Sequence, residues 1–102
     1  MITYDYNRFI KEINSGVITE MYFAVKDYAH YKNCNIKRVV DTYRDGSEHV
    51  RIVVRLHPDG EGTWCYDKFE ENCKLFKMGR QGTFTLEGIW RKLEIYKIVY
   101  SE

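Results

Sequence analysis

Cysteine and histidine are the residue types here that could act as nucleophiles, general bases or metal ligands, and this 102-residue chain has three of each. They are Cys34, Cys65, Cys73, His30, His49 and His57. A cysteine nucleophile needs a histidine base and a group that orients it, and no sequence signature of such an arrangement surrounds any of them. Structural zinc sites use closely spaced cysteine or histidine pairs, and only a mixed pair, His30 and Cys34, has such spacing. We expect no enzymatic activity, no metal site and no cofactor.

A glycine-bracketed segment, Gly79–Gly82, raises the question of phosphate binding. It matches neither the dinucleotide-binding fingerprint nor the P-loop pattern. Its plain interpretation is a helix end followed by a turn. The functional hypothesis for this segment is a contact between an anion and Arg80, supported by backbone amides.

Basic and aromatic residues gather in the middle of the chain, in a pattern that suits a nucleic-acid surface on a β-ribbon. They are Lys37, Tyr43, His49, Arg51 and Arg55. Exposed aromatic rings can stack bases, and basic side chains can hold phosphates. Asp41 falls on the same face, where it could pair with Arg51, and the net charge of the chain is only +1. Nucleic-acid binding is therefore the second choice for this surface.

Nine tyrosines in a compact chain without catalytic motifs favour a protein-binding surface, because tyrosine is enriched at recognition interfaces. The candidate anchors are Tyr28, Tyr31, Tyr43, Tyr66 and Tyr100. The residues predicted to contact the partner are Lys37, Tyr43, His49, Arg51, Arg55, Tyr28 and Tyr31. We expect a small non-enzymatic module that binds another protein. Small proteins with a Lys-, Ile- and Tyr-rich composition are often encoded by low-GC bacteria or their phages, and the role we expect for such a protein is that of an inhibitor or adaptor.

Two further alternatives stay open. A small-molecule site, for a nucleotide for example, would lie between sheet and helices and be lined by Trp64, Trp90, Tyr22 and Phe84. A homodimer would form through an uncovered edge strand.

The elements that would position these residues begin with a helix over residues 5–14, capped by Asp5 or Thr3 and ended by Gly16. A strand over 17–26 follows, with Val17, Thr19 and Met21 on the apolar side and Ile18 and Tyr22 on the other. Residues 27–35 show no periodicity and are expected to form a loop, with continuation of the strand through Tyr28 as the alternative.

Two alternating runs around Asp45-Gly46 then predict a β-hairpin over 36–57. A two-residue turn would mix polar and apolar faces, so a three-residue loop with a glycine bulge is preferred. This register directs one set of side chains inward: Ile36, Val40, Val50, Ile52, Val54 and Leu56. Arg38 falls on this apolar face and is the residue that fits the register least.

The remaining pattern predicts a turn at 58–62, a strand at 63–66, a capped helix at 68–78 and a loop at 80–83. A helix over 86–93 with Thr85 as its cap precedes a strand over 94–100, with a continuous helix over 86–100 as the alternative. The order α-β-β-β-β-α-α-β indicates one α+β domain over 1–102, with an antiparallel sheet of about five strands covered on one face by two or three helices. No signal peptide, membrane span or paired cysteine set is apparent, so we expect a cytoplasmic protein with free thiols and no membrane partner.

Overall fold

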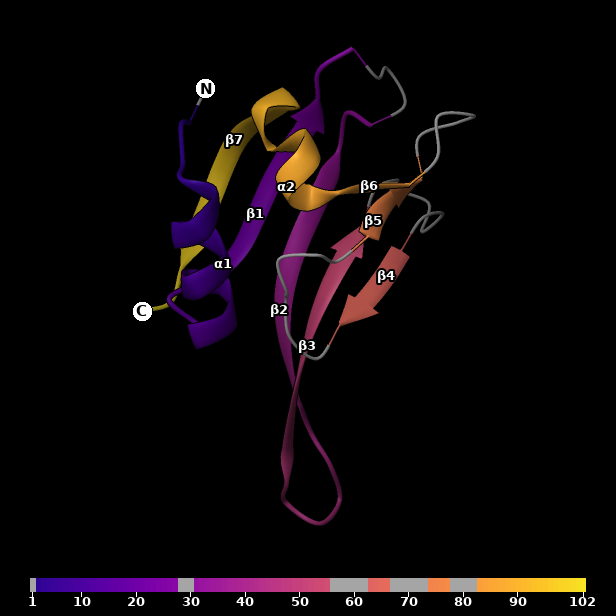
Figure 1. Ribbon diagram of the computed structural model, residues 1–102. Helices are drawn as coiled ribbons and strands as arrows, with labels where there is room; N and C mark the ends of the chain where they lie inside the picture. Colours follow the sequence, from indigo (N-terminus) through magenta and orange to yellow (C-terminus); the bar gives the residue numbers. More distant parts are fainter. Residues whose placement is uncertain (1, 28–30, 56–62, 67–73, 78–82) are drawn as a thin grey trace.

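The computed structural model describes residues 2–27, 31–55, 63–66, 74–77 and 83–102. Its elements in chain order are α1 (Tyr6–Ser15), β1 (Ile18–Val25), β2 (Cys34–Thr42), β3 (Glu48–Arg55), β4 (Thr63–Tyr66), β5 (Lys74–Lys77), β6 (Thr83–Thr85), α2 (Leu86–Ile89), the 3-10 turn η2 (Trp90–Lys92) and β7 (Leu93–Tyr100). The predicted α+β class with an antiparallel sheet is confirmed, although the order of elements differs in detail (Figure 1).

The main sheet has the strand order β4-β3-β2-β1-β7, and all its neighbouring strands are antiparallel. The hairpin of β2 and β3 has the predicted register, since Val40 lies opposite Val50 and Ile36 lies opposite Val54. Its loop contains three residues, 44–46, and Gly46 has a φ of 85°. The Gly46 N–H donates to the Tyr43 carbonyl at 2.9 Å, so the predicted glycine bulge is present.

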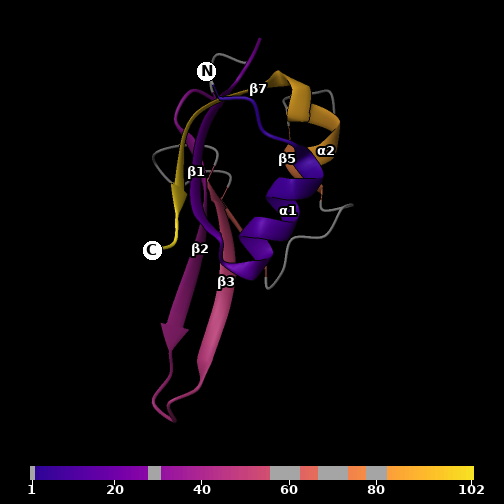
Figure 2. The same ribbon diagram turned by 90° about the vertical axis from the view of Figure 1, so that its left-hand side faces the viewer.

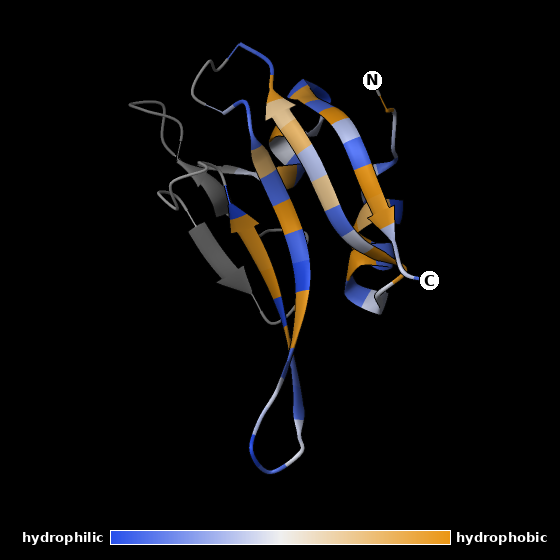
Figure 3. Cartoon of the chain, turned by 180° about the vertical axis from the view of Figure 1, so that it is seen from behind, coloured by the Kyte–Doolittle hydropathy of each residue, from blue (hydrophilic) through white to orange (hydrophobic). Residues whose placement is uncertain are grey.

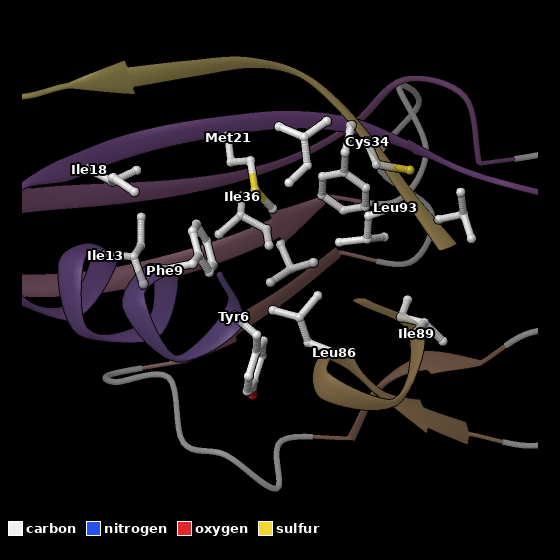
Figure 4. Close-up of a cluster of buried hydrophobic side chains, with 14 of the residues drawn as sticks. Tyr6, Phe9, Ile13, Ile18, Met21, Cys34, Ile36, Leu86, Ile89 and Leu93 are labelled. Atoms are coloured by element: carbon white, nitrogen blue, oxygen red, sulfur yellow. The ribbon is translucent and has the colours of Figure 1, made fainter. Parts of the chain in front are cut away.

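Both helices lie on the same face of this sheet, and the core fills the space between the two layers (Figure 2). Asp5 caps α1 by accepting a hydrogen bond from the Arg8 N–H at 2.9 Å, and Gly16 ends it with a φ of 85°. The apolar stripe of α1, formed by Tyr6, Phe9 and Ile13, points toward strand residues that include Met21 and Ile36 (Figure 4). Because α1 and α2 cover the same face, no helix of the described residues lies on the opposite face of the sheet (Figure 3).

The predicted helix over 68–78 is wrong at 74–77, which form strand β5. This strand pairs with β6 in a separate two-stranded sheet, and β6 runs directly into α2. The helix-like spacing of apolar residues is a signal of intrinsic preference, which the pairing of residues 74–77 with residues 83–85 overrides. Residues 67–73 and the anion-site candidate Arg80 lie outside the described residues.

At the C-terminal end, Thr85 caps α2 by accepting from the Gly88 N–H at 2.9 Å, as predicted. The helix is shorter than expected, because α2 and η2 together end at Lys92. Residues 93–100 form strand β7, so the alternative of a continuous helix is excluded.

The predicted orientations of Val17 and Ile18 are wrong, and Val40 is less buried than predicted. Ile18 is fully buried and Val17 is exposed, the reverse of the expected alternation, because the pairing of β1 with β7 shifts register between Ile18 and Glu20. Val40 lies on the predicted face, yet 45% of it is exposed. The hairpin extends past the end of α1, so the outer part of this face lies beyond that helix (Figures 1 and 2).

Candidate binding surface on the open face of the sheet

The open face of the sheet contains a β-bulge that places two consecutive residues of β7 beside Tyr22 of β1. Tyr22 lies opposite Lys97 and the next residue, Phe23, lies opposite Ile95, so Tyr96 is the extra residue of β7. Ile95 is in the core, whereas both Tyr96 and Lys97 are exposed. A bulge of this kind redirects side chains, and here it concentrates two of them on the outer face.

Tyr22 is the centre of a cluster built from three adjacent strands. The ammonium of Lys37 in β2 lies 5.5 Å from the centroid of the Tyr22 ring, and that of Lys97 in β7 lies 5.3 Å from it. The ring of Tyr96 lies 6.4 Å from the same ring, and Lys37 forms a 3.6 Å ion pair with Glu20. We call Glu20, Tyr22, Lys37, Tyr96 and Lys97 the Tyr22 cluster. Burial raises the pKa of Tyr96, with smaller contributions from Cys34 and Tyr22, so its hydroxyl stays protonated at neutral pH.

Farther along the same face, Asp41 and Arg51 form the cross-strand ion pair that the sequence suggested, with 2.7 Å between Oδ2 and Nη2. The two residues are diagonal neighbours, because Asp41 lies opposite His49 and Arg51 lies opposite Val39. The pair partly neutralises the basic charge on which a nucleic-acid surface would depend.

The hairpin continues beyond this pair as a projecting arm, which we define as residues 40–50 (Figure 1). At its tip the rings of Tyr43 and His49 stack with centroids 3.9 Å apart, and 51% of Tyr43 is exposed. Asp45 accepts hydrogen bonds from the Ser47 N–H at 2.9 Å and from the Ser47 hydroxyl at 2.6 Å. These two bonds lower the pKa of Asp45 and hold the turn in one conformation.

Of the other predicted contact residues, Arg55 is exposed on β3, whereas Tyr31 lies in the core with 9% exposure. Burial raises the pKa of Tyr31, and its place in the core removes it from the exposed surface. Among the wider anchor candidates, Tyr100 is exposed at the end of β7. Tyr28 and the side chain of Tyr66 lie outside the described part of the chain.

Trp90 and Tyr22, two of the four residues predicted to line a small-molecule site, do not face a common pocket. Trp90 faces a cleft of about 650 Å³ on the helical side, between residues 3–7 and α2, whereas Tyr22 lies on the opposite face of the sheet. The indole Nε1 of Trp90 donates to the Tyr4 carbonyl at 2.8 Å, and its ring packs against Tyr6 and Phe9. The side chains of Trp64 and Phe84 lie outside the described residues.

A second polar network ties the N-terminal segment to α1. The Tyr4 hydroxyl donates to the carboxylate of Glu12, which also pairs with Arg8 through a 2.6 Å contact. Burial and the contact with Glu12 raise the pKa of Tyr4, and the Tyr4 hydroxyl and the Arg8 guanidinium together lower the pKa of Glu12. This network fixes the segment that covers one end of β7.

No group of three or more potential metal-ligating side chains occurs among the residues that the structure describes. Cys34 is fully buried, and burial raises the pKa of its thiol to about 12, so the thiol is unreactive at neutral pH. Within the described ranges, no helix combines the length and the apolar character needed to cross a bilayer.

Comparisons with models of protein families, with curated proteins and with solved structures find no match for this chain. The case for a binding surface on the open face therefore rests on the contacts described above. Lys37, Arg51 and Arg55 lie on the outer face of the hairpin, as predicted, whereas the proximity of Tyr22, Tyr96 and Lys97 was not predicted. The strand over residues 94–100 could be predicted from the sequence, but the bulge that places Tyr96 and Lys97 on the same face could not.

Proposed function

We propose that this chain is a small non-enzymatic binding module that contacts another protein through the open face of its sheet and the projecting arm. The observation that carries this proposal is the mixture of paired charges and aromatic rings on a face that neither α1 nor α2 covers. Lys37 pairs with Glu20 and Arg51 pairs with Asp41, both across neighbouring strands. Interfaces with alternating charges and exposed tyrosines suit one specific partner better than a uniform polyanion.

The arm supports the same proposal because it presents an aromatic pair at the tip of a projecting hairpin. Tyr43 and His49 stack on each other, and the neighbouring residues include the acidic Asp45 and Glu48 as well as Arg44. A ribbon that enters a nucleic-acid groove would repel phosphates with these carboxylates. An inhibitor or adaptor of bacterial or phage origin, acting in the cytoplasm, is the kind of protein to which we assign the chain.

The test is capture from a nuclease-treated bacterial lysate on the immobilised chain, with bound proteins quantified by mass spectrometry. We expect one protein in stoichiometric amount on the wild type. It should be lost from the double variant Tyr43→Ala/His49→Ala and kept by Lys11→Ala, which alters an exposed residue of α1 on the covered side. Recovery of nothing, or of equal amounts on all three proteins, would contradict the proposal. Retention of nucleic acid from an untreated lysate would favour the alternative surface function.

A further inference from the structure

The Tyr22 cluster holds more positive charge than its own carboxylate neutralises. Lys37 and Lys97 both direct their ammonium groups to the ring of Tyr22, from the strands on either side of β1. Glu20 pairs with Lys37, whereas no carboxylate in the described ranges lies within ion-pair distance of Lys97. The cluster therefore presents a net positive charge on an aromatic base.

We infer that the Tyr22 cluster is the docking site for an acidic segment of the partner protein, in which a carboxylate lies beside an apolar or aromatic side chain. This inference rests on the proposed function and names the chemistry of the partner. A carboxylate near both lysines would gain charge-assisted hydrogen bonds, which are stronger than neutral ones. The rings of Tyr22 and Tyr96 would contact the neighbouring carbon surface, and their hydroxyls would remain available as donors.

The bulge in β7 supports a binding role over a merely solvated strand face. A regular strand would send Tyr96 and Lys97 to opposite faces, whereas both are exposed here and both approach Tyr22. Bulges that re-aim side chains are over-represented beside functional sites. The bulge interrupts the backbone pairing of β1 with β7 at one position, and it brings Tyr96 and Lys97 to the same side of the sheet as Tyr22.

Charge also distinguishes this partner from the other occupants of an open sheet face. A second copy of the chain docked here by its own cluster would bring like charges together. A nucleic-acid strand crossing the face would meet Glu20, Asp41 and Glu94, which lie on three different strands of it. A compact acidic segment avoids the like-charge conflict of a second copy. It meets Glu20 only as the partner of Lys37, while the ammonium of Lys97 beside Tyr22 stays available to its carboxylate.

The test uses the ¹⁵N-labelled full chain and a short Glu-rich peptide that contains a single Tyr. Amide chemical shifts are followed in a titration at low ionic strength and again near physiological ionic strength. We expect shifts centred on Tyr22, Lys37 and Lys97, which weaken with salt and are absent with the matched Gln-rich peptide. Lys97→Gln should weaken the affinity about fivefold, the factor that one exposed ion pair supports. Lys11→Gln removes the same charge from α1 and should leave the affinity unchanged.

Absence of shifts in the cluster, or equal shifts with the Gln-rich peptide, would overturn the inference. A short oligothymidylate that moves the same amides at equal or lower concentration would overturn it in favour of nucleic acid. These failures are separable from failure of the proposed function. If the lysate still yields a protein that the arm variant loses, only the acidic chemistry of the partner is wrong.

Discussion

The guanidinium of Arg38 packs against Gly16, the residue that ends α1. A Cβ added to Gly16 would lie 3.1 Å from Cζ and 3.2 Å from Nη1 of Arg38. This contact explains why Arg38 occupies the apolar face of the hairpin, where the sequence pattern fits it least. Its charge lies at the negative end of the helix dipole, and its buried Nε has no hydrogen-bond partner among the residues that the structure describes. The pair thereby links the end of the helix to the base of the arm.

The contact predicts that two glycines with the same backbone conformation differ in their tolerance of alanine. Gly16 and Gly46 both have a φ of 85°, but an added Cβ at Gly46 meets nothing within 4 Å. Gly46→Ala should lower the free energy of unfolding by about 1 kcal/mol, the cost of a left-handed residue with a side chain. Gly16→Ala should cost more, about 2 kcal/mol, because Arg38 must also move.

Urea denaturation of both variants, alone and with Arg38→Ala, measures these costs. In the Arg38→Ala background the two glycine substitutions should have equal effects. Equal effects in the wild-type background would mean that backbone strain alone sets the cost and that the contact with Arg38 contributes nothing.

How far the sequence predicts this fold depends on whether the signal is local. The hairpin register follows from alternation around Asp45-Gly46, and the ends of α1 follow from Asp5 and Gly16; these features were predicted and are present. Lys74–Lys77 was predicted as helix because its strand partner, Thr83–Thr85, is separate in sequence and the two strands are short. The alternation of polar and apolar residues also predicted the face on which Val40 lies. It did not predict how far along the hairpin α1 and α2 cover that face.

On the candidate surface, too, the residues placed by local sequence patterns were predicted and those placed by contacts between distant strands were not. Lys37, Arg51 and Arg55 could be assigned to the outer face from one hairpin, whose strands are neighbours in sequence. Tyr22 and Lys97 meet only because β7 pairs with β1, a contact between residues far apart along the chain. Their meeting depends in addition on a bulge, which changes which face each residue occupies and leaves no clear sequence pattern.

The ion pair between Asp41 and Arg51 should contribute little to stability despite its 2.7 Å length. Their side chains are 34% and 46% exposed, so solvent screens the attraction. A double-mutant cycle with Asp41→Asn and Arg51→Gln should give a coupling of about 0.5 kcal/mol that shrinks as salt is added. The 3.6 Å pair of Glu20 and Lys37 is the internal comparison and should couple more weakly. A salt-independent coupling above about 2 kcal/mol would contradict this account of a screened surface pair.

Buried Cys34 should make the fold sensitive to alkaline pH. Burial raises the pKa of its thiol from 9.0 to about 12, so the thiol stays neutral in the folded state while it ionises in the unfolded chain. The stability linked to this group is therefore complete below pH 9 and falls between pH 9 and 12. The slope should approach about 1.4 kcal/mol per pH unit for this one proton.

Denaturation curves at increasing pH, in a Cys65→Ser/Cys73→Ser background, isolate this thiol. Cys34→Ala is the control and should have a flatter profile just above pH 9, before the buried tyrosines contribute. A thiol reagent at pH 8 should modify Cys34 only at the rate of opening of the fold. Rapid modification under native conditions would show that the thiol is accessible.

Trp90 should hold the N-terminal segment over the end of β7. Its indole Nε1 donates to the Tyr4 carbonyl at 2.8 Å. Two residues before Tyr4, the Ile2 N–H donates to the Ile95 carbonyl at 2.8 Å. Trp90→Phe keeps an aromatic ring beside Tyr6 and Phe9 but removes the indole donor. We expect a loss of about 1–2 kcal/mol of unfolding free energy, together with faster hydrogen exchange of the Ile2 amide. Tyr96→Phe, on the opposite face, should change neither quantity. Faster exchange throughout the sheet instead of at Ile2 would show that Trp90 supports the core as a whole.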